Sequence, residues 1–208
     1  MKYTGERVIP ELMKQMNGLL LEHLARYHFS IHYAKGRILD FACGSGFGSN
    51  IMAVAAKKAI AEVIAVDIDP EAIAYAKGKY YHPLISFQVE NCVDPSIPER
   101  FGQFDLIVSF ETLEHVDNEE IFMRNIYQML KPGGTAVIST PFGQGRGMPT
   151  SEPFHVHQLT EGEFQDLFAL YEEVQFYYQK GVLIEPAPGR EGRHYPIGIA
   201  VCKKSTQA

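Results

Sequence analysis

A glycine-rich turn is the first stretch of this chain whose residue types could bind a ligand. Residues 38–48 read ILDFACGSGFG, an apolar segment that runs into a G-x-G-x-G pattern. Where a strand turns into a helix, the first backbone N–H groups of the helix are unpaired, and residues without a Cβ let a ligand approach the main chain. We therefore expect a ligand to bind against the turn that contains Gly44, Gly46 and Gly48.

Two acidic residues accompany the turn. Asp40 stands at the end of the apolar segment before it, and Asp67 ends a second apolar run, residues 63–66. A carboxylate at the end of the second strand of a βαβ unit accepts hydrogen bonds from ribose hydroxyls. The third glycine of nicotinamide and flavin fingerprints would fall at Ser49, so the pattern differs from theirs. The sequence thus predicts a nucleotide-like ligand of another kind.

Acidic and histidine side chains form a second candidate group. Glu111, Glu114 and His115 have the spacing i, i+3 and i+4, so a single helical turn would place them on one face. His155 and His157 follow the next predicted strand. Carboxylates and imidazoles that meet at the end of a strand can bind a divalent metal ion. Without a metal, each of the three histidines is a candidate general base.

Alternating apolar and amphipathic stretches predict the elements that position these residues. Strands are expected at about 38–41, 63–66, 85–89, 104–110, 135–140, 173–178 and 197–203, and helices within 10–33, 47–58, 70–80, 117–130 and 160–170. We expect Asp117 to cap its helix, and Glu119 and Glu120 to lie on the solvated face of that helix. Strands and helices that alternate with short links indicate an α/β protein with a doubly wound, mostly parallel sheet, whose ligands bind at the carboxyl ends of the strands.

Length and composition indicate one globular domain. The 208 residues are enough for one domain with a full core, and the apolar content of 46% is ordinary for a globular protein. The net charge of −6 disfavours a nucleic-acid partner, because phosphate backbones are bound by clustered Lys and Arg. We find no apolar run of 18 residues and no hydrophobic leader, and we expect a cytoplasmic protein without a membrane span. The distant cysteines Cys43, Cys92 and Cys202 predict neither a disulfide framework nor a zinc cluster.

The glycine turn, with Asp40 and Asp67, resembles motif I and the ribose-binding acid of the class I S-adenosylmethionine-dependent methyltransferases. The phrase LKPGG at residues 130–134, followed by a strand, recurs throughout that family, and the resemblance spans about residues 37–140. It implies a Rossmann-like sheet of seven strands, of which the last two form an antiparallel hairpin. A single methyltransferase domain would then occupy residues 1–208, with cap helices in 1–34, a cofactor-binding half in 35–140 and a substrate-side half in 141–208.

The same resemblance implies which residues contact the cofactor S-adenosylmethionine. They are Asp40, Gly44, Gly46, Gly48, Asp67, Ile68, Asn91 and Cys92. Asn91 stands where the family commonly has an Asp that binds the adenine amino group, and its side-chain carbonyl can accept the same hydrogen bond. Residues 4–11 resemble a segment that lies over the cofactor pocket in many small bacterial methyltransferases, and a frayed terminus is the alternative.

The pattern E-x-x-E-H with a later histidine resembles the Hen-type small-RNA 2′-O-methyltransferases and the ubiquinone-pathway O-methyltransferases. In those families two Glu and two His bind a divalent cation beside the acceptor hydroxyl. Carried over to this chain, the metal ligands would be Glu111, Glu114, His115 and His155. His155 matches the family ligand by its distance from the following helix, whereas His157 does not and would lie beside the ion or act as a base. Carboxylate and imidazole ligands do not choose among Mg²⁺, Mn²⁺, Fe²⁺ and Zn²⁺.

The expected activity is methylation of an oxygen, or as a second choice a nitrogen, of a small polar acceptor such as a sugar or a natural-product intermediate. The loops at 141–153 and 185–196 are expected to line the acceptor pocket. Two alternatives stay open. One is an RNA 2′-O-methyltransferase, which the Glu and His pattern favours and the acidic charge opposes, and the other is a cofactor-binding partner protein without turnover. The sequence indicates neither the identity of the acceptor nor the oligomeric state.

Overall fold

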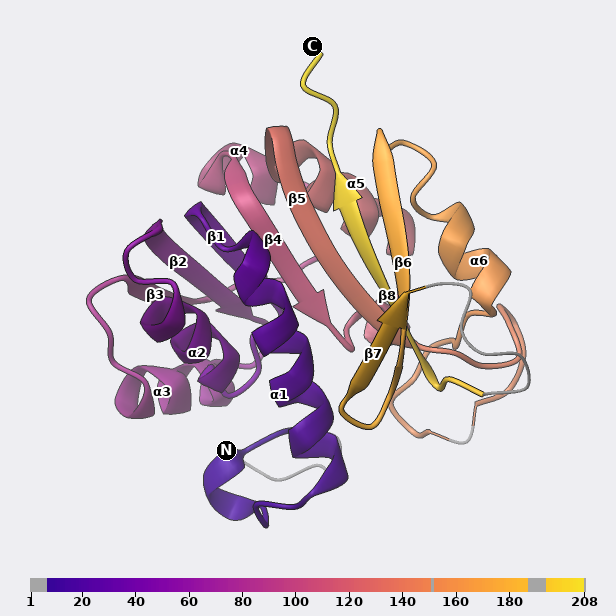
Figure 1. The fold of residues 1–208 in the computed structure, drawn as a ribbon, viewed down its shortest axis with the longest axis horizontal. Helices are drawn as coiled ribbons and strands as arrows, with labels where there is room; N and C mark the ends of the chain where they lie inside the picture. Colours follow the sequence, from indigo (N-terminus) through magenta and orange to yellow (C-terminus); the bar gives the residue numbers. More distant parts are fainter. Residues whose placement is uncertain (1–6, 151, 187–193, 208) are drawn as a thin grey trace.

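The computed structural model describes residues 7–150, 152–186 and 194–207, and in these residues one mixed sheet of eight strands runs through the molecule (Figure 1). The strands lie in the order β3-β2-β1-β4-β5-β8-β6-β7. Their bounds are β1 Gly36–Phe41, β2 Ile60–Asp67, β3 Ile85–Val89, β4 Phe104–Phe110, β5 Leu130–Pro141, β6 Glu173–Lys180, β7 Leu183–Pro186 and β8 Ile197–Lys203. All pairs among β1 to β5 are parallel, and the pairs that involve β6, β7 and β8 are antiparallel. The predicted doubly wound, mostly parallel α/β fold is therefore confirmed.

Helices cover both faces of the sheet (Figure 1). One face carries α1 Gly18–Ser30, α2 Phe47–Ala55 and α3 Pro70–Lys79, and the other carries α4 Ile97–Phe101, α5 Glu119–Met129 and α6 Glu161–Asp166. Ile38 of β1 belongs to the apolar cluster that contains Met52 of α2, whereas the next residue, Leu39, belongs to the cluster that contains Phe122 of α5. Strands that are covered on both faces are apolar at successive positions, which is why they were predictable. None of the described helices is both long enough and apolar enough to cross a membrane.

The sheet has one strand more than the predicted seven. After β6 the chain turns back into the short strand β7, and Lys180 pairs with Leu183, so only Gly181 and Val182 form the turn. Gly181 has φ = +59°, a conformation that glycine adopts without strain. Because β7 is four residues long and has no clear alternation of buried and exposed positions, its sequence pattern does not predict a strand. The last two predicted strands correspond to β6 and β8, which pair antiparallel as expected.

Two boundaries near α5 differ from the prediction. The cap of α5 is Asn118 and not Asp117, because the Oδ1 of Asn118 accepts the N–H of Ile121 at 2.9 Å. Both residue types are good caps, and the local path of the chain selects the second. β5 begins at Leu130, which pairs with Phe104 of β4, so the chain passes from α5 into the strand before the LKPGG segment ends.

The carboxyl ends of the parallel strands meet at one edge of the sheet, the lower edge in Figure 1. The turn between β1 and α2 lies there, together with the loops that follow β4 and β5 (Figure 1). The short 3-10 turns are η1 Pro10–Leu12, η2 Ile31–Tyr33 and η3 Leu113–His115, and η3 follows β4 at this edge. The fold thus gathers both groups of candidate residues at the same edge of the sheet.

Candidate active site

The glycine turn connects β1 to α2, but its three glycines serve different purposes. Gly44 has φ = +56° and open space where a Cβ would stand, so a ligand can approach its main chain. At Gly46, with φ = +82°, a Cβ would lie 2.7 Å from the Cβ of Ala76 in α3. At Gly48 a Cβ would overlap the ring of Tyr27 in α1. The room for a ligand is therefore at Gly44, whereas Gly46 and Gly48 lack side chains because two helices pack closely against them.

Gly48→Ala is expected to lower the free energy of unfolding by about 1–3 kcal/mol, because the added methyl group has to displace the ring of Tyr27. Gly78→Ala in α3 is the matched control. Nothing lies within 4 Å of its added Cβ, and it should stabilise the helix by about 0.5–1 kcal/mol. Urea unfolding measures both variants, and equal free energies would contradict the packing role of Gly48.

Asp40 lies beneath the glycine turn and is only 1% exposed. Its two carboxyl oxygens accept the hydroxyl of Tyr27 at 3.2 and 3.3 Å, and one of them also accepts the hydroxyl of Ser49 at 2.6 Å. Burial raises the pKa of Asp40 to about 7. Since Tyr27 belongs to α1 and Ser49 to α2, the carboxyl joins both helices to the end of β1. Asp40 would thus act on a ligand through the position of the turn and not by direct contact.

Asp40 is expected to make the free energy of unfolding fall between about pH 4 and pH 7. Its pKa is higher in the folded protein than the value of about 3.9 in an unfolded chain, so over this interval the folded state keeps a proton that the unfolded state has lost. This contribution to stability is complete below the unfolded pKa and is lost as the pH rises. Asp40→Asn, which cannot titrate, should show a flatter pH profile in urea unfolding. Parallel profiles of the variant and the wild type would rule out this role of Asp40.

Asp67, at the end of β2, holds the glycine turn from the other side. Its Oδ2 accepts the N–H of Gly44 at 2.8 Å, and its Oδ1 accepts the N–H of Asp69 at 2.9 Å. These bonds fix the carboxylate next to the main chain that is open at Gly44. This is the position at which βαβ proteins bind a ribose.

The described part of the N-terminal segment lies across the same turn. Ser45 donates its hydroxyl to the carbonyl of Val8 at 2.7 Å, and Arg7 forms an ion pair with Asp69 at 2.7 Å. This part of the chain is therefore held against the turn and the start of α3, and it is not frayed. Residues 4–6 of the predicted segment lie outside the described residues.

The other predicted cofactor contacts differ in exposure. Ile68 follows Asp67, and its side chain is 64% exposed at the carboxyl edge of the sheet. Asn91 is exposed, but its side-chain carbonyl accepts the N–H of Val93 at 3.1 Å. Cys92 is buried in the apolar core. Of these three residues, Ile68 is the one whose side chain is free to cover an apolar ligand surface.

Three of the four predicted metal ligands come together beyond β4 and β5. Atoms of Glu114, His115 and His155 that can bind a metal all lie within 4.8 Å of one another. The rings of His115 and His155 meet edge to face, with centroids 4.9 Å apart. Main-chain contacts hold the two segments together: the N–H of Val156 donates to the carbonyl of Glu114 at 2.8 Å, and Nδ1 of His115 lies 2.9 Å from the carbonyl of Phe154.

Glu114 is the buried member of this group, with 1% of its surface exposed. Its Oε2 accepts the hydroxyl of Thr140 at 3.0 Å. Burial, followed by the nearby charge of Glu111, raises the pKa of Glu114 well above its ordinary value. A bound cation would relieve this cost, and one carboxylate with two imidazoles is a donor set that suits a divalent metal ion.

The other two predicted residues of this group point elsewhere. Glu111 has φ = +49°, and its Oε1 accepts the hydroxyl of Ser139 at 2.8 Å. His157 turns its Nε2 toward Glu119, 3.7 Å from Oε2. The structure thus brings His155, and not His157, to Glu114 and His115, and it leaves the carboxylate of Glu111 on Ser139.

The solvated position predicted for Glu119 is wrong, because Arg146 donates its Nε–H to Glu119 at 2.7 Å. An ion pair with a residue so far along the chain is invisible in the sequence. Its neighbour Glu120 is exposed, as expected. Sequence reasoning also missed Ser139 and Thr140, which hold the two glutamates. The signal that could have found them is a pair of polar residues that directly follows the apolar residues 136–138 of β5.

The two loops that were expected to line an acceptor pocket are described in part. The loop after β5 is described except for residue 151, and of the second loop residues 187–193 lie outside the described chain. The first loop is folded back on itself, since the N–H of Gly143 donates to the carbonyl of Leu159 at 2.9 Å and that of Gly145 to the carbonyl of Gln158 at 3.0 Å. Main-chain hydrogen bonds thus join the two ends of the segment that carries His155.

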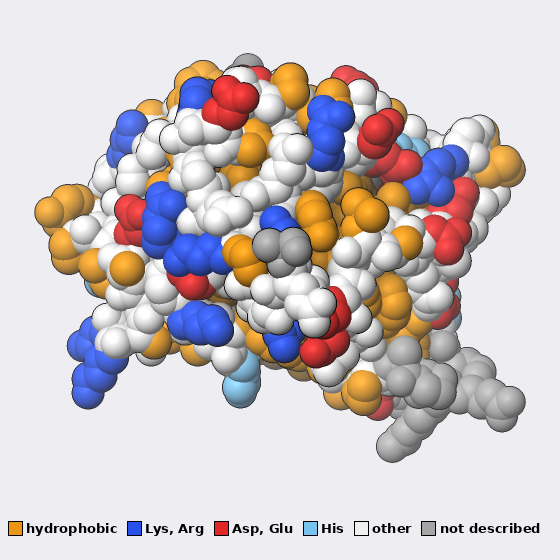
Figure 2. Space-filling model, turned by 90° about the horizontal axis from the view of Figure 1, so that it is seen from above, with side chains coloured by type: hydrophobic (Ala, Val, Ile, Leu, Met, Phe, Trp, Pro, Cys, Tyr) orange, Lys and Arg blue, Asp and Glu red, His pale blue; other side chains and the backbone are white. Residues whose placement is uncertain are grey.

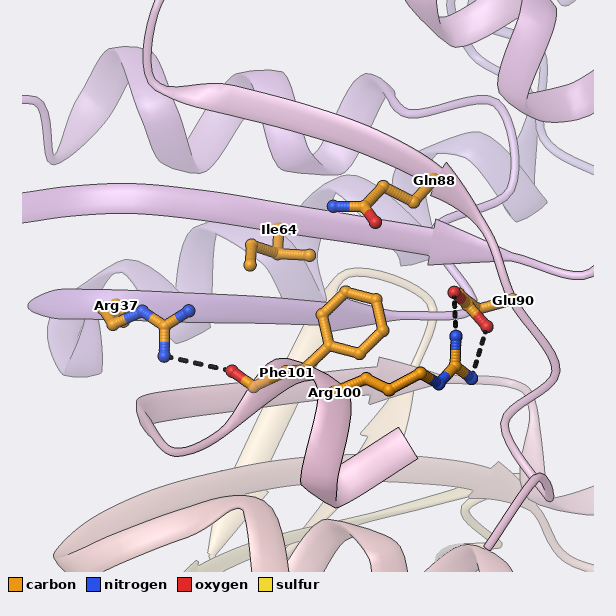
Figure 3. A pocket seen from close by; sticks show the side chains of 6 residues that line it. All are labelled: Arg37, Ile64, Gln88, Glu90, Arg100 and Phe101. Atoms are coloured by element: carbon orange, nitrogen blue, oxygen red, sulfur yellow. Dashed lines mark hydrogen bonds and ion pairs between the residues drawn. The ribbon is translucent and has the colours of Figure 1, made fainter. Parts of the chain in front are cut away.

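A groove of about 320 Å³ lies on the α4 side of the sheet (Figure 3). It is lined by Arg37, Ile64, Gln88, Glu90, Arg100 and Phe101. Figure 3 shows both terminal nitrogens of Arg100 directed at Glu90, at 2.6 and 2.8 Å, and a guanidinium nitrogen of Arg37 directed at the carbonyl of Phe101, at 3.2 Å. Within the groove Arg100 pairs with Glu90, whereas Arg37 pairs with Glu62, which does not line it. No candidate site residue is among the lining residues.

Comparison with known proteins shows the family of this chain. A family described as "Methyltransferase domain" matches residues 39–138. A probable S-adenosylmethionine-dependent methyltransferase from Mycolicibacterium smegmatis is 31% identical over 169 residues, which cover 79% of this chain and 62% of that protein. The chain belongs to the class I S-adenosylmethionine-dependent methyltransferases. A ubiquinone biosynthesis O-methyltransferase from Xanthomonas oryzae pv. oryzae is 34% identical over 109 residues, which cover 51% of this methyltransferase chain and 44% of that protein.

Solved methyltransferase structures share the fold of this chain. A TehB-like S-adenosylmethionine-dependent methyltransferase from Corynebacterium glutamicum has a TM-score of 0.62 and 24% identity, over 89% of each chain. A chain of the complex between the Haloferax volcanii Trm112 methyltransferase activator and a putative methyltransferase has a TM-score of 0.66 and 16% identity, over 88% of this chain and 90% of that chain. The methyltransferase chain spans less than two thirds of the length of the curated relatives above, so it matches only part of each longer protein.

Proposed function

We propose that this methyltransferase chain transfers the methyl group of S-adenosylmethionine to an oxygen of a small polar acceptor, with a divalent metal ion at Glu114, His115 and His155. The observation that carries the proposal is the convergence of these three side chains at the edge of the sheet where the glycine turn and Asp67 also lie. The likeness to ubiquinone biosynthesis O-methyltransferases over half of the chain supports oxygen as the acceptor atom.

The donor side of the proposed site is the glycine turn. S-adenosylmethionine carries a methyl group that is already activated on a sulfonium, so the chain has to hold the donor, align the acceptor and remove the acceptor's proton. We assign the amino-acid part of the cofactor to the open main chain at Gly44 and the ribose to the carboxylate of Asp67. Ile68, exposed beside Asp67, is assigned to the apolar face of the adenine.

The acceptor side is the group beyond β4 and β5. Glu114, His115 and His155 would hold the metal ion, and Glu111 would become a fourth ligand if its carboxylate left Ser139. A cation there would lower the pKa of a coordinated hydroxyl and fix its position. When the ion is bound, His157 is the candidate for the base that takes the acceptor's proton, and without the ion His115 and His155 are candidates as well.

Charge favours a small acceptor over a nucleic acid. The chain has a net charge of −6, whereas binding of a phosphate backbone requires clustered Lys and Arg. On the face seen in Figure 2, at the end of the molecule opposite the candidate site, basic side chains lie among acidic ones. Some of the basic side chains of the chain are paired, such as Arg37 with Glu62 and Lys131 with Asp105.

Isotope transfer tests the proposed function. A cell extract is incubated with the protein and methyl-labelled S-adenosylmethionine, and mass spectrometry should find the label in a methyl ether of a small molecule. Elemental analysis of protein purified without chelator, and activity after EDTA treatment with each divalent metal added back, should assign the ion. Label that appears in RNA instead would refute the proposed acceptor, and full activity of a metal-free preparation would refute the proposed ion.

A further inference from the structure

The two residues that follow His155 each hold the chain to another element. Val156 donates its N–H to the carbonyl of Glu114, within η3. His157 turns away from that group toward Glu119, at the first turn of α5, with 3.7 Å between Nε2 and Oε2. The chain directly after His155 is therefore tied to both η3 and α5.

The contact between Glu119 and His157 is largely buried. The two side chains are 25% and 14% exposed, and the facing atoms, Oε2 and Nε2, are closed to solvent and have no hydrogen-bond partner within the described part of the chain. A buried polar atom that is left unpaired costs about 1–3 kcal/mol. Oε2 of Glu119 and Nε2 of His157 are therefore the atoms best placed to pair with each other, and the 3.7 Å between them is within the range of an ion pair.

Arg146 fixes the carboxylate that faces His157. Its Nε–H donates to Oε1 of Glu119 at 2.7 Å, which leaves Oε2 directed at the imidazole. The backbone N–H of Arg146 donates to both carboxylate oxygens of Glu163, at 3.2 and 3.3 Å. Glu163 in turn closes the capping box of α6 with Thr160. Glu119 is thereby tied through Arg146 to the start of α6 and cannot rotate away from His157 without breaking an ion pair.

We propose that Glu119 and Arg146 are positioning residues of the active site, which hold the ring of His155 against Glu114 and His115 through His157. Glu119 and Arg146 do not belong to the metal-binding group. The proposal deepens the proposed function, since it takes His155 as a site residue. The position of the ring can nevertheless be measured whether or not a metal binds or a methyl group is transferred.

Nuclear magnetic resonance of the histidine rings tests the proposal. The edge contact with His115 should shift the ring C–H resonance of His155 away from that of a free histidine, and His155→Ala identifies the signal by its loss. In Glu119→Ala most of this shift should disappear, whereas the matched control Glu120→Ala, at an exposed neighbour, should keep it. Glu119→Gln should restore the shift, because its amide can accept from Arg146 and donate to His157.

Arg146→Met provides an independent variant, because it leaves the carboxylate of Glu119 in place but no longer fixed. It should lose the shift like Glu119→Ala, and Arg124→Met, at an exposed position of α5, should not. An unchanged His155 signal in both Glu119→Ala and Arg146→Met would overturn the proposal, and if one of them does not fold, the other decides.

Titration with Mn²⁺ alone is a second measurement. The affinity of Glu119→Ala for Mn²⁺ should be about tenfold weaker than that of the wild type. Absence of Mn²⁺ binding by the wild type would count against the proposed metal ion, while the ring signals still decide the positioning role.

Discussion

In a His155→Ala variant, methyl transfer is expected to fall by about two to four orders of magnitude, because a group that positions or deprotonates the acceptor contributes about that factor. His155 reaches Glu114 and His115 from a separate segment, so no neighbouring side chain of the turn replaces it. The affinity for S-adenosylmethionine should stay at its wild-type value, since His155 is not part of the glycine turn. Turnover with the identified acceptor and calorimetry with the cofactor measure the two quantities.

The control for this variant is His28→Ala, at an exposed position of α1, which should turn over normally. Metal content by elemental analysis should fall in His155→Ala and stay unchanged in His28→Ala. Normal turnover of His155→Ala, together with full activity in the absence of metal, would leave Glu114 and His115 as a packed turn without a catalytic role.

Asp67→Ala should weaken the binding of S-adenosylmethionine and S-adenosylhomocysteine by about 1.5–3 kcal/mol, or about 10- to 150-fold in Kd. The substitution removes the carboxylate assigned to the ribose hydroxyls and also the acceptor of the Gly44 N–H. Asp67→Asn should have an intermediate affinity, because an amide keeps one acceptor oxygen. NAD should bind to none of these proteins.

Asp117→Ala is the matched control for the cofactor titration, because Asp117 is exposed and does not cap α5. Its affinity for both ligands should equal that of the wild type. Calorimetry that gives the same Kd for Asp67→Ala as for Asp117→Ala would remove Asp67 from the cofactor site.

The sheet could be read from local patterns. The predicted strands 85–89, 104–110 and 197–203 have the bounds of β3, β4 and β8. For β4 and β8 the reason is that an apolar run between turn residues is typical of a strand buried on both faces. Likewise Asp69 was recognisable as the cap of α3, since Pro70 and Glu71 follow it, and its side chain accepts the N–H of Glu71. Two short elements, β7 with four residues and α4 with five, were not predicted, because their residues show no clear period.

The sequence by itself determined which residues capable of chemistry stand close together along the chain, because the spacing of residues within one turn is a local property. The i, i+3, i+4 spacing of Glu111, Glu114 and His115 predicted that one helical turn would bring all three together. The turn η3 spans only Leu113–His115, and Glu111, with φ = +49°, lies outside it. Which side chains meet was decided by the tertiary structure. The carboxylate of Glu111 turns to Ser139, while that of Glu114 stays beside His115, although both stand in the same short segment.

Contacts between distant parts of the chain were likewise decided only by the tertiary structure. Gly44, Gly46 and Gly48 are equivalent in the motif, yet α1 and α3 fill the space beside two of them and leave the space at Gly44 open. Glu119 looked like a solvated residue until the loop after β5 brought Arg146 and His157 to it. Such pairings depend on the path of a loop and on burial between elements, and neither quantity is encoded in the spacing of neighbouring residues.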